Sequence, residues 1–278
     1  MAKRICALTM VRNDEFFLRK WVEYYSSQLG PANLYVYFDG QDQVVPDFCK
    51  EINVCVRERV PGMVAAADRG RIDFLSEQAA QLLQTYDMVI GTDVDEFLVV
   101  DPALGKTLPE FLSQLPERVS YSGLGIDVGQ HLDKEGEVEA DVPFLKQRHF
   151  ARLSTRYSKS TVITKPVRWG SGFHRVRNRN FRIIKDLYMF HFGCIDLKRL
   201  QDKLLDKDKI DTGWERHLRK RAKTIYDVSQ GTIRSWDPWV KIARCVQNVV
   251  RPPYAWNKPA MFNSVIIVRI PERFETIV

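Results

Sequence analysis

Apolar and polar positions alternate with two different periods along the first third of the chain. Short apolar runs predict strands at residues 5–10, 33–38, 54–58 and 88–90. Between these runs, aromatic and aliphatic residues recur at helical spacing and predict helices over residues 14–29 and 69–86. Strands that alternate with helices are typical of an α/β fold in which helices flank a mostly parallel, Rossmann-like sheet.

The rest of the chain shows weaker patterns. A short helix is predicted at residues 108–115, and residues 119–195 have the pattern of several strands and loops, with a strand at 187–193. Residues 197–228 are strongly charged and helical in period, and a tail follows from residue 229. We therefore predict a core over residues 1–196 and a C-terminal helical and tail extension, residues 197–278, that packs on it.

The composition is that of a globular protein. Of 278 residues, 45% are hydrophobic and 28% are charged, which excludes a disordered chain. The apolar runs are shorter than the roughly 18–20 residues that cross a bilayer. The N-terminal run lacks a plausible cleavage site, so we interpret it as a strand rather than a signal peptide. Five cysteines without metal-ligand spacing predict buried, reduced thiols and a cytoplasmic protein.

Positive charge is concentrated in one part of the sequence. The formal net charge is +7, and residues 146–223 carry many of the Lys and Arg side chains. A basic surface attracts anionic partners such as nucleotide phosphates, anionic lipids or nucleic acid. In this region Lys159, Lys165 and Arg168 would suit a diphosphate or an anionic acceptor. The alternative is a basic strand edge that discourages strand pairing.

Polar clusters follow three of the predicted strands, at residues 12–14, 39–40 and 93–95. Ligands of parallel sheets bind beyond the carboxyl ends of the strands, so we expect these clusters to share one site. Asp93 and Asp95 come directly after the apolar strand at 88–90, and two carboxylates in such a turn can hold Mg²⁺ or Mn²⁺. The sequence therefore predicts a divalent metal site at these two residues; the alternative is a solvated acidic turn.

The acidic segment also carries a family resemblance. Residues 90–98, Ile-Gly-Thr-Asp-Val-Asp-Glu-Phe-Leu, resemble the Asp-Val-Asp-Glu-Phe segment of family-2-like and family-92-like glycosyltransferases. Residues 10–25 are similar to the opening segment of these families, and residues 37–42 to the end of their second strand. The resemblance implies the GT-A fold, a nucleotide-diphosphate sugar as donor and a divalent metal, Mn²⁺ or Mg²⁺.

The same resemblance assigns residues to the donor. It implies that the backbone near Met10 and Arg12, together with the carboxylate of Asp39, faces the nucleoside. It also implies that Arg69 and Arg71, just ahead of the predicted helix that leads to the acidic segment, reach the base or the phosphates. The alternative is that these two arginines lie exposed at the start of a surface helix and contact no ligand.

A histidine in the second half of the chain completes the implied metal site. His191 and Gly193 end the predicted strand at 187–193, and Lys198 follows. This segment is similar to the His-x-x-Gly-x-x-Lys segment of related GT-A enzymes. The resemblance implies that His191 is a metal ligand and that Lys198 contacts the diphosphate. His174 is the alternative ligand, and for each histidine the alternative role is a packed core or strand-end residue.

An inverting transferase needs a carboxylate base that deprotonates the acceptor hydroxyl. The chain has no Asp or Glu between Asp141 and Asp186, and we take Asp127 as the first candidate and Glu215 as the second. The leading hypothesis is metal-dependent transfer of a sugar from a nucleotide diphosphate to a hydroxyl of a glycan or lipid-linked acceptor, with inversion, in polysaccharide biosynthesis.

Other classes of function stay open. A basic module for nucleic acid or an anionic surface fits the charge, but the sequence has no nucleic-acid-binding signature, and we expect no nucleic-acid partner. A metal-dependent phosphatase of the haloacid dehalogenase type also has Asp-x-Asp after an apolar strand, normally the first strand. The aromatic residues Trp236, Trp239, Trp256 and Phe262 of the tail could contact lipid headgroups and hold the protein at the inner face of an anionic membrane. The alternative is a packed C-terminal cap.

Overall fold

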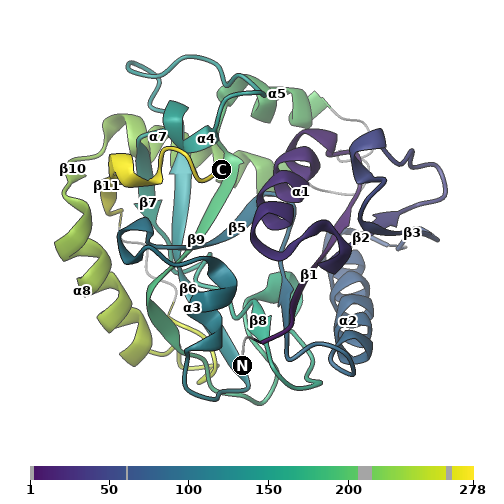
Figure 1. Cartoon of the computed structure of the whole chain (residues 1–278). Helices are drawn as coiled ribbons and strands as arrows, with labels where there is room; N and C mark the ends of the chain where they lie inside the picture. The colour runs from purple at the N-terminus through teal and green to yellow at the C-terminus, as the bar shows by residue number, and fades with distance from the viewer. Residues whose placement is uncertain (1–2, 61, 206–214, 261–264) are drawn as a thin grey trace.

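The computed structural model describes residues 3–60, 62–205, 215–260 and 265–278, except for the side chains of residues 64, 203–205 and 215–221. Figure 1 shows the arrangement of its strands and helices. The strands are β1 (Ile5–Val11), β2 (Leu34–Asp39), β3 (Asn53–Arg57), β4 (Met88–Gly91), β5 (Glu96–Val100), β6 (Ser120–Gly129), β7 (Phe150–Leu153), β8 (Val162–Ile163), β9 (Ile183–Cys194), β10 (Ile233–Arg234) and β11 (Ile267–Arg269). The helices are α1 (Glu15–Leu29), α2 (Val64–Leu82), α3 (Leu108–Ser113), α4 (Phe144–Gln147), α5 (Leu197–Leu205), α7 (Glu215–Gln230) and α8 (Trp236–Val249).

Within the described residues, eleven strands join in one sheet. Its N-terminal part, in the order β3–β2–β1–β4, is parallel throughout, and β8 continues it antiparallel to β4. The other strands form a mixed part around β6 and β9, with β5 beside β9 and with β7, β11 and β10 leading to the far edge. The predicted α/β fold, a large sheet flanked by helices, is confirmed.

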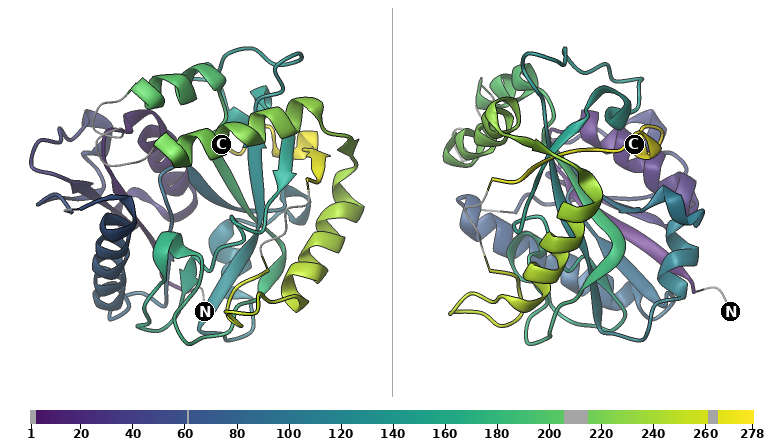
Figure 2. Two further views of the ribbon diagram at one scale, coloured as in Figure 1. Left: turned by 180° about the vertical axis from the view of Figure 1, so that it is seen from behind. Right: turned by 90° about the vertical axis from the view of Figure 1, so that its left-hand side faces the viewer.

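Helices cover both faces of the parallel part because successive residues of a strand point to opposite sides. On β1, Ile5 and Ala7 pack in the same apolar cluster as α1, whereas Cys6, Leu8 and Met10 pack in the cluster that contains α2. Figures 1 and 2 together show these two helices on opposite faces. Burial on both faces explains why this strand is apolar at every position but one, the small Thr9.

Two differences from the predicted elements lie on either side of the acidic residues. Helix α2 begins at Val64 and ends at Leu82, earlier than predicted at both ends, so Arg69 and Arg71 lie well inside the helix and not at its start. Strand β5, which is fully buried and begins at Glu96, was not predicted. Glu96 therefore belongs to a strand, and the residues after the Asp-x-Asp pair turn back into the sheet.

The C-terminal segment contributes both helices and strands. The predicted helix at residues 197–228 is present as α5 and α7, and residues 206–214 lie outside the described part of the chain. Helix α8 occupies what the sequence analysis took as a tail, and its Trp236 is buried against Tyr188, Phe190 and Phe274. Strand β11 pairs with β7 and extends the sheet. The division at residue 196 stays a prediction.

The cysteines and the helices bear on two further expectations. All five cysteines are free thiols; Cys6, Cys49 and Cys194 are buried, but Cys55 and Cys245 are exposed, contrary to the expectation of buried thiols. Burial raises the pKa of Cys6 to about 12 and that of Cys49 to about 11, so these thiols stay protonated at neutral pH. Among the described residues, no helix combines the length and the apolar character that crossing a membrane requires.

Candidate metal centre

The acidic turn, residues 92–95, joins β4 to β5 and is held by α1. The indole Nε1 of Trp21 donates a hydrogen bond to Thr92 Oγ1 at 2.9 Å. The backbone nitrogen of Leu98 donates to the phenol oxygen of Tyr25, also at 2.9 Å. The aromatic residues that predicted this helix therefore anchor the chain before and after the turn, and its carboxylates extend from a fixed backbone.

Three neighbouring strands bring three polar side chains into one row. Glu96 of β5 pairs with His191 of β9, and His191 pairs with Asp127 of β6. Directly paired residues on adjacent strands lie on the same face of a sheet. Their side chains are nearly inaccessible, with exposures of 1% for Glu96, 0% for His191 and 5% for Asp127. The acidic turn therefore continues into a buried polar row.

Asp95, Glu96 and His191 converge at one end of this row. Each offers one potential ligand atom, and these atoms lie within 4.8 Å of one another. His191 Nε2 is 3.4 Å from Asp95 Oδ2. Among the described residues, neither His191 Nε2 nor Glu96 Oε2 has a hydrogen-bond partner, although both atoms are buried. A buried polar atom without a partner costs about 1–3 kcal/mol, so these atoms fit a bound cation better than an empty interior.

Gly193 leaves room for such a cation. A Cβ at this position would lie 2.6 Å from His191 Nε2 and 2.9 Å from Asp95 Oδ2. Gly193 follows His191 by two residues on β9, so a side chain there would point to the same face as the imidazole. It would fill the space beside both ligand atoms. The fit to a small cation therefore rests on unpartnered atoms and available space as well as on negative charge.

The orientation of His191 is fixed from two sides. Its Nδ1 donates to Asp127 Oδ1 at 2.7 Å, which directs Nε2 toward Asp95. The hydroxyl of Thr224, on α7, donates to the other carboxylate oxygen of Asp127 at 2.7 Å. The ring of Tyr157 stacks on the imidazole with centroids 3.7 Å apart. A carboxylate behind a histidine is the usual arrangement that orients a metal-ligating imidazole.

Asp93, on the other side of the turn, forms ion pairs with two basic side chains of the protein. Arg71 Nη1 donates to Oδ1 at 2.7 Å, and Lys159 Nζ donates to Oδ2 at 2.9 Å. Lys159 is only 2% exposed, and its Nζ also lies 2.5 Å from Glu96 Oε1. Burial would raise the pKa of Asp93, but Lys159 and Arg71 outweigh burial and hold this pKa well below its usual range.

The charges around the turn do not balance. Burial raises the pKa of Glu96 to about 7, against the opposing effect of Lys159 and with a contribution from Asp93 and Asp95. Burial would lower the pKa of His191, but the carboxylates of Asp95 and Asp127 raise it. Four carboxylates, those of Asp93, Asp95, Glu96 and Asp127, lie near two permanent cations, Arg71 and Lys159. Neighbouring carboxylates add to the effect of burial on the pKa of Glu96 and oppose the effect of burial on the pKa of His191.

The residues predicted to face the nucleoside lie at the carboxyl ends of β1 and β2. Arg12 Nη1 donates to the backbone oxygen of Asp39 at 2.7 Å, and its guanidinium forms a bidentate pair with Asp42. The carboxylate of Asp39 accepts from the backbone nitrogen of Val60 at 2.7 Å. Met10 is buried in β1. Since β1 lies directly between β2 and β4, these ends and the acidic turn lie at one edge of the sheet, and a shared site there stays a prediction.

Other predicted residues lie away from the acidic turn. Arg69 is exposed on α2, whereas Arg71, two residues later, contacts Asp93. Lys198 forms an exposed ion pair with Glu137, 3.0 Å from Nζ to the carboxylate. Glu215 begins α7, but its side chain lies outside the described residues.

Lys159, Arg168 and His174 also differ in whether they lie near the acidic turn. Arg168 forms exposed ion pairs with acidic side chains of α2. Lys159 is buried against the acidic turn. His174 lies close enough to Lys159 that burial first, and then this ammonium, lower its pKa to about 3.

Glu96 was not recognised as part of the site from sequence, and Gly193 was connected to the site only through the resemblance of its segment to that of related GT-A enzymes. A signal for Glu96 was present, because it follows Asp95 directly and the apolar run after it predicts a strand. The role of Gly193 depends on the pairing of β9 with β5, which joins residues almost a hundred positions apart and is not visible in the local pattern. Thr224 comes from a helix still further along the chain.

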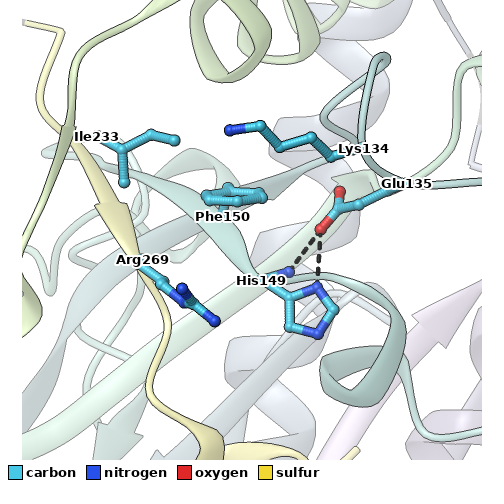
Figure 3. Close-up of a pocket in the computed structure, with 6 residues that line it drawn as sticks. All are labelled: Lys134, Glu135, His149, Phe150, Ile233 and Arg269. Atoms are coloured by element: carbon cyan, nitrogen blue, oxygen red, sulfur yellow. Dashed lines mark hydrogen bonds and ion pairs between the residues drawn. The ribbon is translucent and has the colours of Figure 1, made fainter.

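A separate cavity of about 370 Å³ lies at the edge of the mixed part of the sheet. Figure 3 shows Lys134 and Arg269 on either side of the Phe150 ring, with Glu135 bonded to His149. None of the sequence-predicted site residues lines it. The carboxylate of Glu135 accepts hydrogen bonds there from two backbone nitrogens and contacts the imidazole of His149.

No protein-family model and no curated protein matches this chain. Among solved structures, a mannose-1-phosphate geranyltransferase from Thermus thermophilus is similar at 11% identity and a TM-score of 0.30, over 96% of this chain and 74% of that chain. The bifunctional glycosyltransferase WbbM is similar at 16% identity and a TM-score of 0.25, over 46% of this chain and 24% of that chain. Similarity at these TM-scores does not show a family, so we argue the function from the site alone.

Proposed function

We propose that this chain is a metal-dependent glycosyltransferase that takes a sugar from a nucleotide diphosphate and transfers it to a hydroxyl of a glycan or lipid-linked acceptor, with inversion. The observation that carries the proposal is the convergence of Asp95, Glu96 and His191 beside Gly193, next to the carboxyl end of β4, where the parallel part of the sheet meets the mixed part. The carboxyl ends of parallel strands are where α/β folds bind nucleotides.

The metal is held by Asp95 and His191, with Glu96 as the third ligand. Two carboxylates and one imidazole nitrogen suit Mn²⁺ better than Mg²⁺, because Mg²⁺ prefers oxygen ligands throughout. When bound, the ion supplies Lewis-acid stabilisation to the diphosphate leaving group. A divalent cation would also balance the carboxylates that raise the pKa of His191 and add to the effect of burial on the pKa of Glu96.

Arg71 and Lys159 are assigned to the diphosphate. Both contact Asp93, which lies two residues from Asp95 in the same turn. A guanidinium and an ammonium fixed in this way present donors to phosphate oxygens without loss of side-chain entropy on binding. In this proposal Asp93 holds the two cations beside the metal, a role that differs from the direct ligation predicted from sequence.

Asp127 is assigned a positioning role in place of the predicted role as base. Both of its carboxylate oxygens are engaged, one by His191 and the other by Thr224. It therefore fixes the tautomer and the direction of the imidazole. Glu215 stays the candidate for the base that deprotonates the acceptor hydroxyl.

Thermal stability with and without Mn²⁺, across a panel of nucleoside diphosphates and nucleotide sugars, tests the proposal. A ligand at 100 times its dissociation constant adds about 2.7 kcal/mol to the stability of the folded state. We expect one nucleotide to raise the melting temperature only when Mn²⁺ is present.

Transfer activity supplies the second arm of this test. The matching nucleotide sugar should be consumed only when an acceptor hydroxyl is supplied. Folded protein that shows no metal-dependent shift with any nucleotide would contradict the proposal. Release of phosphate from simple phosphomonoesters would instead favour the phosphatase class.

A further inference from the structure

Helix α8 has apolar residues on the face that points away from the protein. Its buried face consists of Trp236, Val240, Ala243 and Gln247, which follow helical spacing. A surface helix of a globular protein normally carries polar residues on the opposite face. Here that outer face carries an apolar stripe at i, i+3, i+4 and i+7, formed by Ile242, Cys245, Val246 and Val249.

The segment after α8 extends this stripe. Val249 is 77% exposed, Tyr254 is 70% exposed and Trp256 is 57% exposed. Arg251 keeps the segment against the helix, because its guanidinium donates to the backbone oxygens of Trp256, Gln247 and Asn248 at 2.8–3.1 Å. The two aromatic rings are therefore held next to the last turn of α8. The right-hand view of Figure 2 looks onto this side of the molecule.

Positive charge surrounds the apolar residues. Residues 234–258 contain one acidic side chain, Asp237, which is 3.3 Å from the guanidinium of Arg273. The same residues contain five cationic side chains, which are Arg234, Lys241, Arg244, Arg251 and Lys258. Two copies of such a face repel each other, whereas an anionic surface attracts it.

We propose that this face of α8, together with Tyr254 and Trp256, docks on an anionic lipid bilayer. Helices that lie in the bilayer interface combine an apolar stripe with flanking Lys and Arg. Tyr and Trp favour the same depth, because their rings are amphipathic. The membrane contact expected from the sequence named Trp236, Trp239, Trp256 and Phe262. Trp236 is buried, Trp239 is only partly exposed, and Phe262 lies outside the described residues, so Trp256 alone of the four is kept in the proposed face. The other residues of this face come from the structure, and the face is independent of the metal centre.

The chain supplies a matched pair of probe sites. Cys245 is exposed within the apolar stripe, whereas Cys55 is exposed on β3, at the opposite end of the strand order from β10 and β11. We would label Cys245 with an environment-sensitive fluorophore in a Cys55→Ser variant, and Cys55 in a Cys245→Ser variant. Each is then mixed with vesicles of phosphatidylglycerol and phosphatidylcholine, or of phosphatidylcholine alone.

The proposal predicts a blue-shifted, brighter emission from the label at Cys245 with anionic vesicles, and no change from the label at Cys55. Val246→Glu together with Val249→Glu should abolish co-sedimentation with these vesicles. Val44→Glu, at an 86% exposed valine elsewhere, should leave it unchanged. Lys241→Gln and Arg244→Gln should each lower partitioning by about fivefold at low salt.

Several outcomes would overturn the proposal. They are equal binding to neutral and anionic vesicles, an equal response from both labels, and no binding by folded protein. A concentration-dependent dimer that the Val246→Glu and Val249→Glu changes disrupt, without vesicle binding, would assign the face to a second copy of the chain. The melting temperature of each variant shows that the comparison is made between folded proteins.

Discussion

The two sides of the acidic turn differ in how their carboxylates are compensated. Asp93 is matched by the protein itself, because each of its oxygens accepts from a cation. Asp95 lies two residues away, beside an imidazole nitrogen and a glutamate oxygen that have no hydrogen-bond partner among the described residues. The same Asp-x-Asp pair therefore provides one carboxylate that organises the protein's cations and one that faces a place for an external cation. Negative charge alone does not define a metal site; here the buried ligand atoms without a hydrogen-bond partner, His191 Nε2 and Glu96 Oε2, mark its place.

The largest effect should come from removing the ammonium group of Lys159, which contacts the carboxylates of both Asp93 and Glu96. Lys159→Met leaves Asp93 and Glu96 buried without their shared ammonium. Breaking a buried ion pair by removing one partner costs about 3–5 kcal/mol, because the other charge stays uncompensated. Urea unfolding should show this loss. Lys198→Met removes an exposed lysine from an ion pair, so it should cost at most about 1 kcal/mol. Equal losses would contradict the structural role given to Lys159.

Filling the space beside Asp95 should remove metal binding without changing any ligand. Gly193→Ala places a methyl group 2.6 Å from His191 Nε2. We expect Mn²⁺ affinity to fall by at least about 100-fold, since loss of outer-shell contacts alone costs about 10–100-fold. Gly136→Ala is the control, because a Cβ there meets nothing within 4 Å. Isothermal titration measures both, and wild-type affinity in the Gly193 variant would rule out this location for the ion.

The fold was easier to predict from sequence than the site. The apolar runs of β1, β2 and β4 and the aromatic face of α1 are local patterns, and burial on two faces makes the strand patterns strong. The metal centre depends on strand pairing over long sequence distances, which placed His191 beside Glu96 and left Gly193 facing Asp95. Helix α8 was missed although its residues show a clear amphipathic contrast; the segment that forms it was taken as part of the C-terminal tail.

A smaller effect on metal affinity should follow from changing the side chain that orients His191 while His191 itself is kept. Asp127→Asn keeps the size of the side chain but changes what it offers to Nδ1 of the imidazole. Outer-shell changes of this kind weaken metal binding about 10–100-fold. We expect that loss in Mn²⁺ affinity with a melting temperature close to that of the wild type. A variant with lower stability and unchanged Mn²⁺ affinity would show that Asp127 has only a structural role.

The smallest effects distinguish two arginines on one helix. Arg71→Ala removes a charge-assisted hydrogen bond from the Asp93 side, whereas Arg69→Ala changes an exposed side chain. Hydrogen bonds to charged groups contribute about 1.5–3 kcal/mol, so the first change should weaken nucleoside diphosphate binding about tenfold or more. The second should leave it within about twofold, as most surface changes do. Competition with a fluorescent nucleotide, in the presence of Mn²⁺, measures both. A comparable loss of nucleoside diphosphate affinity in Arg69→Ala would contradict the assignment of Arg71, and not Arg69, to the diphosphate.

The most direct test counts bound Mn²⁺ by the paramagnetic resonance signal of the free ion, in the wild type and in the Asp95→Asn and Asp93→Asn variants. Circular dichroism establishes that each variant is folded. The account predicts one tight site per chain in the wild type, retention of that site in Asp93→Asn and its loss in Asp95→Asn. Wild-type Mn²⁺ binding by Asp95→Asn, or loss of the site only in Asp93→Asn, would contradict it.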